Sequence, residues 1–477
     1  MSTTTNFLLV GHGCLDMTLP LPSSTSSVLS PGTLISTSPA LFSIGGCVPN
    51  TGAALRILGN TAVQGVFAVA EDEFGSIFLR LLEEIAGKEF FSESCVLFSR
   101  HGPHAEKESV LGDSPKRILE VSIPISNEKE EEKKKYATSY SIILSPQQGD
   151  RTIFHCAGVN NQFSSHHIPV AVRTRLSSTH VVHVGYPPLL KAFCLDNNAR
   201  DIISFLVDAT KNHNCTVSLD MTSPDTALLV QSERVDWVAF LQSVLPLVHL
   251  FTPSIEEIQS CFADRFDDED IDDVDDGDIT MIKKKKRTFP SLLRKAVHIA
   301  NVLISMGVPM VLIKLGAKGL LLRTAPHLST MGRGFDIRNK NHDISEVEHL
   351  TRNHTKLEAW SNISLFAPVF EVDCVGTTGA GDCTVAMFLS CIAADETFCS
   401  IATSGDSSSP LWLCPSQTLM LCSAAGACNV EAHNSTSGMM TIGKITERVG
   451  NGWRRRVSSF FPEGEKPDAF GNFVVSP

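Results

Sequence analysis

The stretch Gly376-Thr377-Thr378-Gly379-Ala380-Gly381-Asp382 precedes an apolar run, Cys383 to Ile392, that has the pattern of a helix. Small residues in a turn that opens a helix let several backbone N–H groups point at one place, and the helix dipole adds positive potential there. An aspartate directly after such a turn lies beside a bound anion and can accept a proton from an attacking hydroxyl. Taken alone, the stretch is equally compatible with a glycine-rich loop and an aspartate that caps the helix.

A second small-residue turn lies near the start of the chain. Gly45-Gly46-Cys47-Val48-Pro49-Asn50 precedes a helix predicted from Thr51 to Leu58. The paired glycines allow a close backbone approach, and Asn50 offers both a donor and an acceptor to a polyol. Asp16 follows the first predicted strand, where a carboxylate can accept two neighbouring hydroxyls, although an aspartate that caps a turn is the alternative.

Apolar runs alternate with helical patterns along most of the chain. The runs that predict buried strands are Phe7–Val10, Ala62–Ala70, His180–Gly185, Thr216–Leu219, Leu247–Phe251 and Met310–Lys314. Strands that alternate with helices predict a parallel sheet with helices on both faces. Ligands of such sheets bind outside the carboxyl ends of the strands.

Three polar segments interrupt this alternation, at residues 106–135, 264–287 and 324–357. We expect them to be surface insertions, partly disordered, because they carry too little apolar area to offset the entropy of ordering. The basic run Lys283–Arg287 follows an acidic block. It is therefore either a nuclear signal or part of a surface loop in which the basic run neutralises the charge of the acidic block.

Composition excludes several classes of protein. The net charge of -12 provides no global basic field for nucleic acid or for an anionic membrane. No stretch approaches the about 20 apolar residues that span a bilayer. The 14 cysteines are scattered without a C-x-x-C pair, which predicts reduced thiols in a cytoplasmic protein. No Walker A sequence is present, so the P-loop mode of phosphate binding is excluded.

Taken together, these residues resemble the ribokinase (PfkB-type) carbohydrate kinase family. The resemblance extends from about Phe7 to about Thr441. The motifs that carry it are Gly11–Asp16, Gly45–Asn50, Asp72–Gly75, Gly149–Ile153, Lys314–Gly319 and Gly376–Asp382.

The resemblance implies an α/β fold, a three-layer α/β/α sandwich with a mostly parallel central sheet and a small β-lid. The lid strands would come from about residues 15–41 and 136–156. Residues 1–450 would form the kinase domain, which contains the three insertions, and residues 451–477 a C-terminal tail. The same resemblance is compatible with a homodimer and gives no reason to expect a nucleic-acid or membrane partner.

The resemblance also implies transfer of phosphate from ATP, with Mg²⁺, to a hydroxyl of a small sugar-like substrate. Asp382 would be the catalytic base, and the backbone of Gly379, Ala380 and Gly381 would form the anion hole. The residues implied on the substrate side are Asp16, Gly45, Gly46, Asn50, Arg151 and Asn160. Those implied for the nucleotide are Gly316, Lys318, Gly319, Ser423 and Asn429, and Glu257 would act near the metal.

Two departures from the family pattern affect the expected ions. The family often has N-x-x-E near Mg²⁺, and here Glu257 is kept while Ser254 replaces the asparagine. That replacement weakens the expectation of the usual metal–water network. Gly376 stands where many members have an aspartate that helps to bind a monovalent cation, so potassium activation is not implied.

Two alternative functions remain open on the same fold. One is a nucleoside kinase, although the subgroup resemblance of Gly185–Pro188 and Asn429–Ala432 favours sugars. The other is a regulator that binds a sugar or a nucleotide without catalysis, because fold alone does not fix function. The intact G-A-G-D sequence favours an enzyme, since a binding protein needs no base at that place.

Overall fold

The computed structural model describes residues 5–21, 34–90, 95–99, 119–122, 136–146, 151–224, 235–262, 289–328, 331–336, 346–403, 412–456 and 466–476. The strands are β1 (Asn6–Gly11), β2 (Cys14–Leu21), β3 (Leu41–Gly45), β4 (Ala62–Ala70), β5 (Cys95–Ser99), β6 (Leu119–Ser122), β7 (Tyr140–Pro146), β8 (Thr152–Cys156), β9 (Val181–Gly185), β10 (Thr216–Asp220), β11 (Leu250–Phe251), β12 (Met310–Lys314), β13 (Leu320–Thr324), β14 (Ser364–Ala367) and β15 (Phe473–Val474). The α-helices are α1 (Cys47–Ile57), α2 (Glu73–Ala86), α3 (Val170–Arg175), α4 (Asp196–Val207), α5 (Trp237–Val244), α6 (Ile255–Cys261), α7 (Phe289–Ser305), α8 (Glu346–Trp360), α9 (Ala380–Ile392), α10 (Glu396–Ala402), α11 (Pro415–Asn429) and α12 (Ile442–Gly450).

The large sheet has the strand order β15-β14-β13-β12-β11-β10-β9-β1-β4-β5-β6. From β6 to β12 neighbouring strands pair in parallel. Strands β13, β14 and β15 extend the sheet by antiparallel pairing. The expectation of a mostly parallel sheet is confirmed, with an antiparallel extension at one edge.

Side chains of β1 show why helices cover both faces of this sheet. Successive residues of a strand point to opposite faces. Phe7 and Leu9 belong to a core shared with α1, α2, α9 and α11, whereas Leu8 and Val10 belong to a core shared with α3, α4, α5 and α7. A strand that is apolar at every position therefore requires a layer on each side, and the three-layer sandwich is confirmed.

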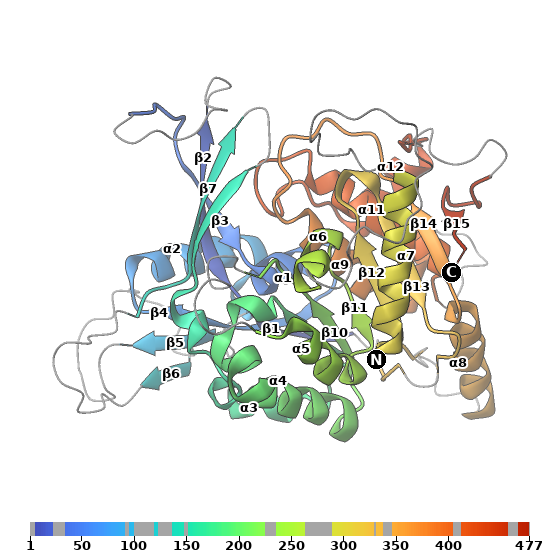
Figure 1. The fold of residues 1–477 in the computed structure, drawn as a ribbon, viewed down its shortest axis with the longest axis horizontal. Coiled ribbons are helices and arrows are strands. Elements are labelled where there is room, and N and C mark those ends of the chain that lie inside the picture. The colour runs from blue at the N-terminus through green and yellow to red at the C-terminus, as the bar shows by residue number, and fades with distance from the viewer. Residues whose placement is uncertain are drawn as a thin grey trace, which may run out of the picture.

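A second sheet, with the order β3-β2-β7-β8, forms the lid. Strands β2, β7 and β8 come from the two segments in which lid strands were expected, whereas β3 begins only where the first of these segments ends. Strands β2 and β7 rise above the core at the upper left of Figure 1. Strand β2 pairs antiparallel with β3 and parallel with β7, and β7 pairs antiparallel with β8. The lid thus joins a segment near residue 20 to one near residue 145.

Asp72 fastens the lid to the core. Its Oδ1 accepts from the backbone of Gly75 at 2.8 Å and so caps α2. The same carboxylate accepts from the backbone N–H of Thr138 at 2.8 Å and from the Thr138 hydroxyl at 2.6 Å. Because Thr138 lies just before β7, one side chain holds both a core helix and the base of the lid.

Some segments expected outside the core supply parts of it. Residues 324–357 include the first turns of α8, whose Lys356 is buried and donates to the carbonyls of Phe335 and Ile392 at 2.7 and 2.8 Å. Residues 451–477, expected as a tail, include β15, which adds an edge strand to the large sheet. Within residues 106–135 only β6 is described, and residues 264–287 lie outside the described residues.

Within the described residues, no single helix has both the length and the apolar composition of a membrane span. Helices α9 and α10 meet those criteria only when counted together, and the chain bends by 119° between them.

We expect Asp72→Ala to destabilise the protein by about 1–3 kcal/mol, because it removes a helix cap and two further hydrogen bonds. Urea denaturation measures this loss. Asp236→Ala is the matched control, since Asp236 caps α5 through Ala239 at 3.0 Å and should cost only the cap. Equal losses for the two variants would contradict the anchoring role of Asp72.

Candidate active site

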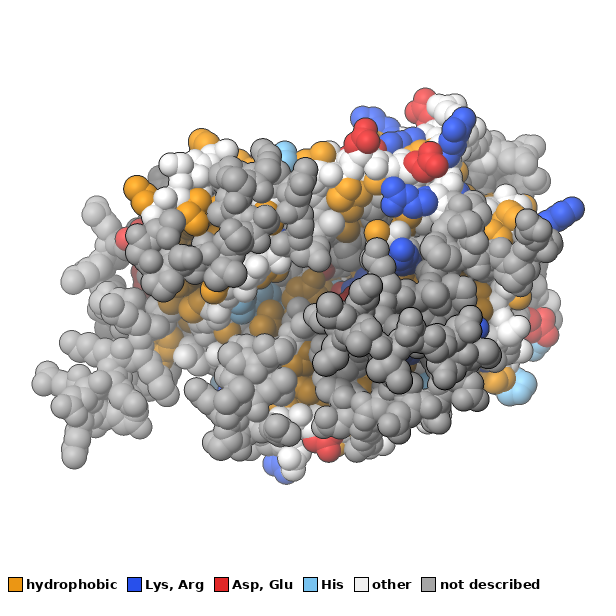
Figure 2. All heavy atoms as spheres, turned by 45° about the horizontal axis from the view of Figure 1, so that its top comes forward, with side chains coloured by type: hydrophobic (Ala, Val, Ile, Leu, Met, Phe, Trp, Pro, Cys, Tyr) orange, Lys and Arg blue, Asp and Glu red, His pale blue; other side chains and the backbone are white. Residues whose placement is uncertain are grey.

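The chemically active side chains gather at the carboxyl end of the parallel strands. Asp220 ends β10, Lys314 ends β12, and Tyr186 directly follows β9. The N-terminus of α9 lies beside them, since Asp382 is bonded to Tyr186. In Figure 2, hydrophobic and histidine side chains lie at the bottom of a hollow. Parallel sheets commonly hold their ligands at this end.

The turn before α9 is built on a glycine that no other residue could replace. Gly379 has a φ of 74°, and a Cβ there would lie 1.9 Å from the carbonyl oxygen of Ser435. Asn429 donates through Nδ2 to the carbonyls of Thr378 and Ser435 at 2.9 and 3.1 Å, which braces the turn from behind. The N–H groups of Gly381 and Asp382 in the first turn of α9 have no acceptor within the helix, and such N–H groups at a helix start can bind an anion.

Ser435, which accepts from Asn429, also contacts the other small-residue turn. The Ser435 hydroxyl donates to the carbonyl of Ile44 at 2.8 Å, immediately before Gly45 and Gly46. Gly46 has a φ of 89°, and a Cβ at Gly45 would lie 2.3 Å from the Asp16 carboxyl. The two glycine turns singled out in the sequence are therefore held together, and each glycine admits a neighbouring polar group.

Asp382 is 3% exposed, and both of its oxygens are hydrogen-bonded. Oδ1 accepts from the Tyr186 hydroxyl at 2.9 Å, and Oδ2 accepts from Asn50 Nδ2 at 2.9 Å. The pKa of Asp382 is raised to about 7, chiefly by burial and also by the nearby Asp220 carboxylate. The donors Asn50 and Tyr186 and the Lys314 cation oppose this increase. The carboxyl can therefore gain or lose a proton near neutral pH.

Tyr186 holds an uncommon backbone conformation to reach Asp382. Its φ of 62° and ψ of 54° lie in the left-handed region, which is unfavourable for a bulky residue. Its N–H donates to the Asp220 carbonyl at 3.3 Å. Strain of this kind persists where the surroundings over-determine the conformation, and it is common at functional sites.

Lys314 places a positive charge beside the anion site. Its ammonium donates to both oxygens of Asp220, at 2.8 and 3.0 Å. A Cβ at Gly381 would lie 3.5 Å from Lys314 Nζ, so the ammonium borders the first turn of α9. Burial lowers the pKa of Lys314, but the carboxylates of Asp220 and Glu257 more than offset this, and the lysine stays charged.

Glu257, the residue expected near the metal, forms a reciprocal cap with Ser254 at the start of α6. Its carboxylate accepts from the Ser254 N–H at 2.6 Å, while its own N–H donates to the Ser254 hydroxyl at 3.2 Å. Serine in place of the family's asparagine thus makes a capping box. Burial raises the pKa of Glu257 to about 7, Lys314 lowers it, and Asp220 raises it.

Buried acceptors without partners occur among the residues that were expected on the substrate side. Asn160 donates to the Gly13 carbonyl at 2.9 Å, but its Oδ1 is buried and has no partner within the described residues. The Oδ1 of Asn50 is likewise buried and has no hydrogen-bond partner within the described residues. Asp16 is 6% exposed, and burial raises the pKa of its carboxyl to about 6 while the Arg151 cation lowers it. Groups of this kind fit the hydroxyl donors of a polyol.

Arg151 connects the lid to the anion turn, because its guanidinium donates to the Thr378 hydroxyl. The residues expected around a nucleotide lie further from Asp382. Gly316 and Lys318 belong to a short 3₁₀ turn after β12. Gly319 has a φ of 134° and packs against the Ala367 carbonyl, and Ser423 donates to the Pro368 carbonyl at 2.9 Å. The structure therefore shows their supporting contacts, and their nucleotide roles stay predictions.

Sequence reasoning missed Lys314 and Tyr186 as site residues. A charged residue that closes an otherwise apolar strand was the available signal for Lys314 and Asp220. Tyr186 carried no such signal, since its role depends on a left-handed backbone and on a partner 196 residues away.

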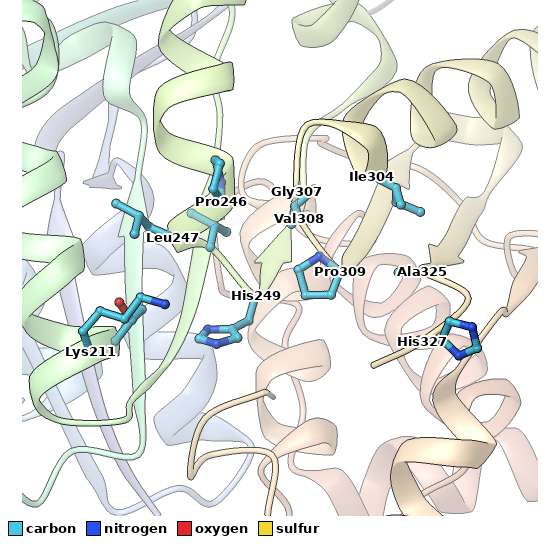
Figure 3. A pocket seen from close by; sticks show the side chains of 12 residues that line it. Lys211, Pro246, Leu247, His249, Ile304, Gly307, Val308, Pro309, Ala325 and His327 are labelled. Atoms are coloured by element: carbon cyan, nitrogen blue, oxygen red, sulfur yellow. The ribbon is translucent and has the colours of Figure 1, made fainter. Parts of the chain in front are cut away.

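A separate cavity of about 240 Å³ lies away from these residues. It is lined by Lys211, His249 and His327 and by apolar side chains before β11 and β12, so it opens at the amino end of the strands (Figure 3). The pKa of His249 is lowered to about 4, chiefly by burial and also by the Lys211 cation.

No protein-family model matches the sequence. No curated protein matches it. Solved structures do match. A fructokinase from Xylella fastidiosa with bound ATP shares 15% identity at a TM-score of 0.53, over 94% of this chain and 99% of that one. A putative ribokinase II from E. coli, in complex with ATP and Mg²⁺, shares 14% identity at a TM-score of 0.52, over 94% of this chain and 99% of that one. The ribokinase of Arabidopsis thaliana complexed with ribose and ATP shares 15% identity at a TM-score of 0.51, over 93% of this chain and 98% of that one.

This chain has the ribokinase fold. The likeness extends over nearly the whole chain, so the fold expected from the sequence motifs is confirmed. At 14–15% identity it does not identify the substrate.

We expect Tyr186→Phe to raise the pKa of Asp382 above about 7, because the lost O–H donor stabilises the ionised carboxylate. Titration of ¹³C-labelled aspartate carboxyl groups by NMR measures the change, and Asp382→Asn assigns the resonance. Tyr140→Phe is the control, since Tyr140 packs against Phe74. An unchanged or lowered pKa would show that the phenol does not stabilise the charge.

Proposed function

We propose that the protein is an ATP-dependent kinase that phosphorylates a hydroxyl of a small sugar-like polyol. The observation that carries the proposal is the buried Asp382 carboxyl at the N-terminus of α9, next to the glycine turn and the Lys314 ammonium. A proton acceptor and an anion site so close together fit phosphate transfer to a hydroxyl, in which the protein mainly positions the groups and stabilises charge.

Asp382 would accept the proton of the attacking hydroxyl. Both of its oxygens are occupied by Tyr186 and Asn50, so a substrate hydroxyl must displace one donor or share its acceptor. The pKa of about 7 makes the ionised carboxylate a stronger base than an exposed aspartate while leaving it substantially ionised at neutral pH. The chain thus holds its base in a form suited to a weakly acidic alcohol.

Charge on the transferred phosphate would be stabilised by fixed donors. These are the N–H groups of the first turn of α9, the Lys314 ammonium and the Arg151 guanidinium, which reaches Thr378 from the lid. Donors held in place before the reaction need no reorganisation as charge develops. Arg151 lies on the lid side, so lid closure would complete this set and exclude water.

The carboxylates near Lys314 fit a divalent cation. The Lys314 cation interacts with the carboxyl groups of Asp220, Glu257 and Asp382, so one positive charge is shared by three acidic groups. When bound, Mg²⁺ would supply positive charge to the phosphates of ATP. Asp220 and Glu257 are the residues that would hold it, with the Glu257 cap restricting how that carboxylate turns.

Asp16, Asn50 and Asn160 support a polyol as the acceptor. They supply one buried carboxylate and two buried amide oxygens that have no partner within the described residues. The solved ribokinase complexed with ribose and ATP, which has the same fold, supports a sugar and ATP as the pair of ligands. A sugar satisfies several such acceptors at once through neighbouring hydroxyls.

A screen for ADP release tests the proposal, with a panel of sugars, sugar phosphates and nucleosides and mass detection of the phosphate ester. We expect acceptor-dependent ADP release with a sugar-type polyol. Asp382→Asn should lower kcat by about 10²–10⁴ and leave the affinity for ATP and acceptor within several-fold. Asp395→Asn, which alters an aspartate that caps α10, is the control. If Asp382→Asn kept more than about a tenth of the wild-type turnover, Asp382 would not be the base.

A further inference from the structure

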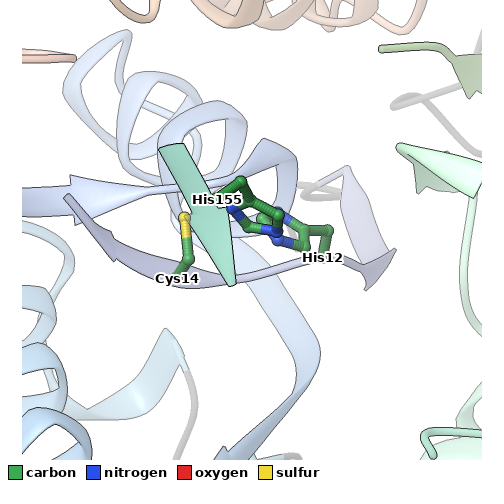
Figure 4. A group of neighbouring side chains, drawn as sticks. All are labelled: His12, Cys14 and His155. Atoms are coloured by element: carbon green, nitrogen blue, oxygen red, sulfur yellow. The ribbon is translucent and has the colours of Figure 1, made fainter. Parts of the chain in front are cut away.

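Three metal-ligating side chains meet where the lid joins the core. His12 lies between β1 and β2, Cys14 is the first residue of β2, and His155 belongs to β8. Each offers one ligand atom, and these atoms all lie within 4.8 Å of one another. Figure 4 shows the two imidazole rings next to each other, with the Cys14 side chain nearby on β2. The ring centroids of the two histidines are 5.1 Å apart.

The surroundings of the three side chains suit metal binding. His12 is 2% exposed, and its Nδ1 is buried without a hydrogen-bond partner in the described part of the chain. The Ser141 hydroxyl lies 3.2 Å from Nδ1 of His155 and can orient that ring, as outer partners of metal-binding histidines commonly do.

We propose that His12, Cys14 and His155 form a binding site for a thiophilic divalent cation such as Zn²⁺. Two imidazole nitrogens and one thiolate are the donor set that such cations prefer, and three protein ligands leave a fourth position for water or a ligand. The site differs in chemistry from the carboxylates around Lys314, which suit a hard cation. On binding, the S–H bond of Cys14 breaks, its proton leaves to solvent and a sulfur–metal bond forms, with no change of oxidation state.

Occupancy of this site would link the lid to the core. His12 comes from the segment after the core strand β1, whereas Cys14 and His155 come from lid strands. The Cys14 sulfur lies 3.3 Å from Oδ1 of Asp16, so a cation on the thiolate would add positive charge next to that buried carboxylate. Resting on the proposed function, an occupied site would restrict lid motion and place positive charge beside Asp16, a residue proposed to contact the acceptor.

The test is titration of Co²⁺ into the reduced, chelator-treated full-length protein. We expect one equivalent to bind with a thiolate-to-cobalt charge-transfer band in the near ultraviolet, which Zn²⁺ then displaces. Cys14→Ser should abolish the band, and His155→Ala should raise the Kd for Co²⁺ at least tenfold. Cys156→Ser, the next residue on the same lid strand, is the matched control and should bind Co²⁺ as the wild type does.

Absence of the band in the wild type, its persistence in Cys14→Ser or its loss in Cys156→Ser would overturn the proposal. Thermal melting confirms that each variant is folded. If Cys14→Ser fails to fold, His155→Ala decides the outcome, because His155 is exposed on the lid and its truncation leaves the core intact. The cobalt band needs no turnover, so its presence or absence is independent of whether the kinase proposal holds.

Discussion

The ion pair between Lys314 and Asp220 is the interaction on which the candidate site depends. The site buries several carboxyl groups at the carboxyl end of one sheet, and buried carboxylates are costly unless they are paired. Lys314 ends β12, Asp220 ends β10, and the two strands are separated only by β11, so the sheet itself brings the charges together. The ammonium also borders α9 and lowers the pKa of Asp382, which would otherwise rise further.

Burial of Asp382 carries a cost for the fold. A carboxyl whose pKa is raised to about 7 in the folded protein binds its proton more tightly than the unfolded chain does. Its contribution to stability is therefore greatest below the unfolded value of about 3.9 and falls as the pH rises through 7. The hydrogen bonds from Asn50 and Tyr186 reduce this loss, and the glycine turns give the backbone the room that the arrangement needs. The site thus accepts lower stability near neutral pH in exchange for a reactive carboxyl, as functional sites often do.

The sequence could predict the layers and the two glycine turns because their causes are local. An apolar run such as Phe7–Val10 requires cover on both faces, and Gly379 and Gly46 are needed for the backbone that they adopt. The partners of Asp382 are not local, since Asn50 and Tyr186 lie 332 and 196 residues away. The contacts of Asn429 are of the same kind: its side chain donates to the carbonyls of Thr378 and Ser435, while its place beside the nucleotide stays a prediction. Motifs thus indicated which segments matter, while the tertiary contacts determine what each side chain does.

The central claim is that Asp382 accepts the proton of the acceptor hydroxyl. The measurement that tests it most directly is the pH dependence of kcat/KM for the best acceptor, which reports ionisations of the free enzyme and substrate. If the ionised Asp382 is required, the rate should rise with pH and level off at a midpoint near 7. A profile that stays flat down to about pH 5, with full activity where Asp382 is protonated, would contradict this account.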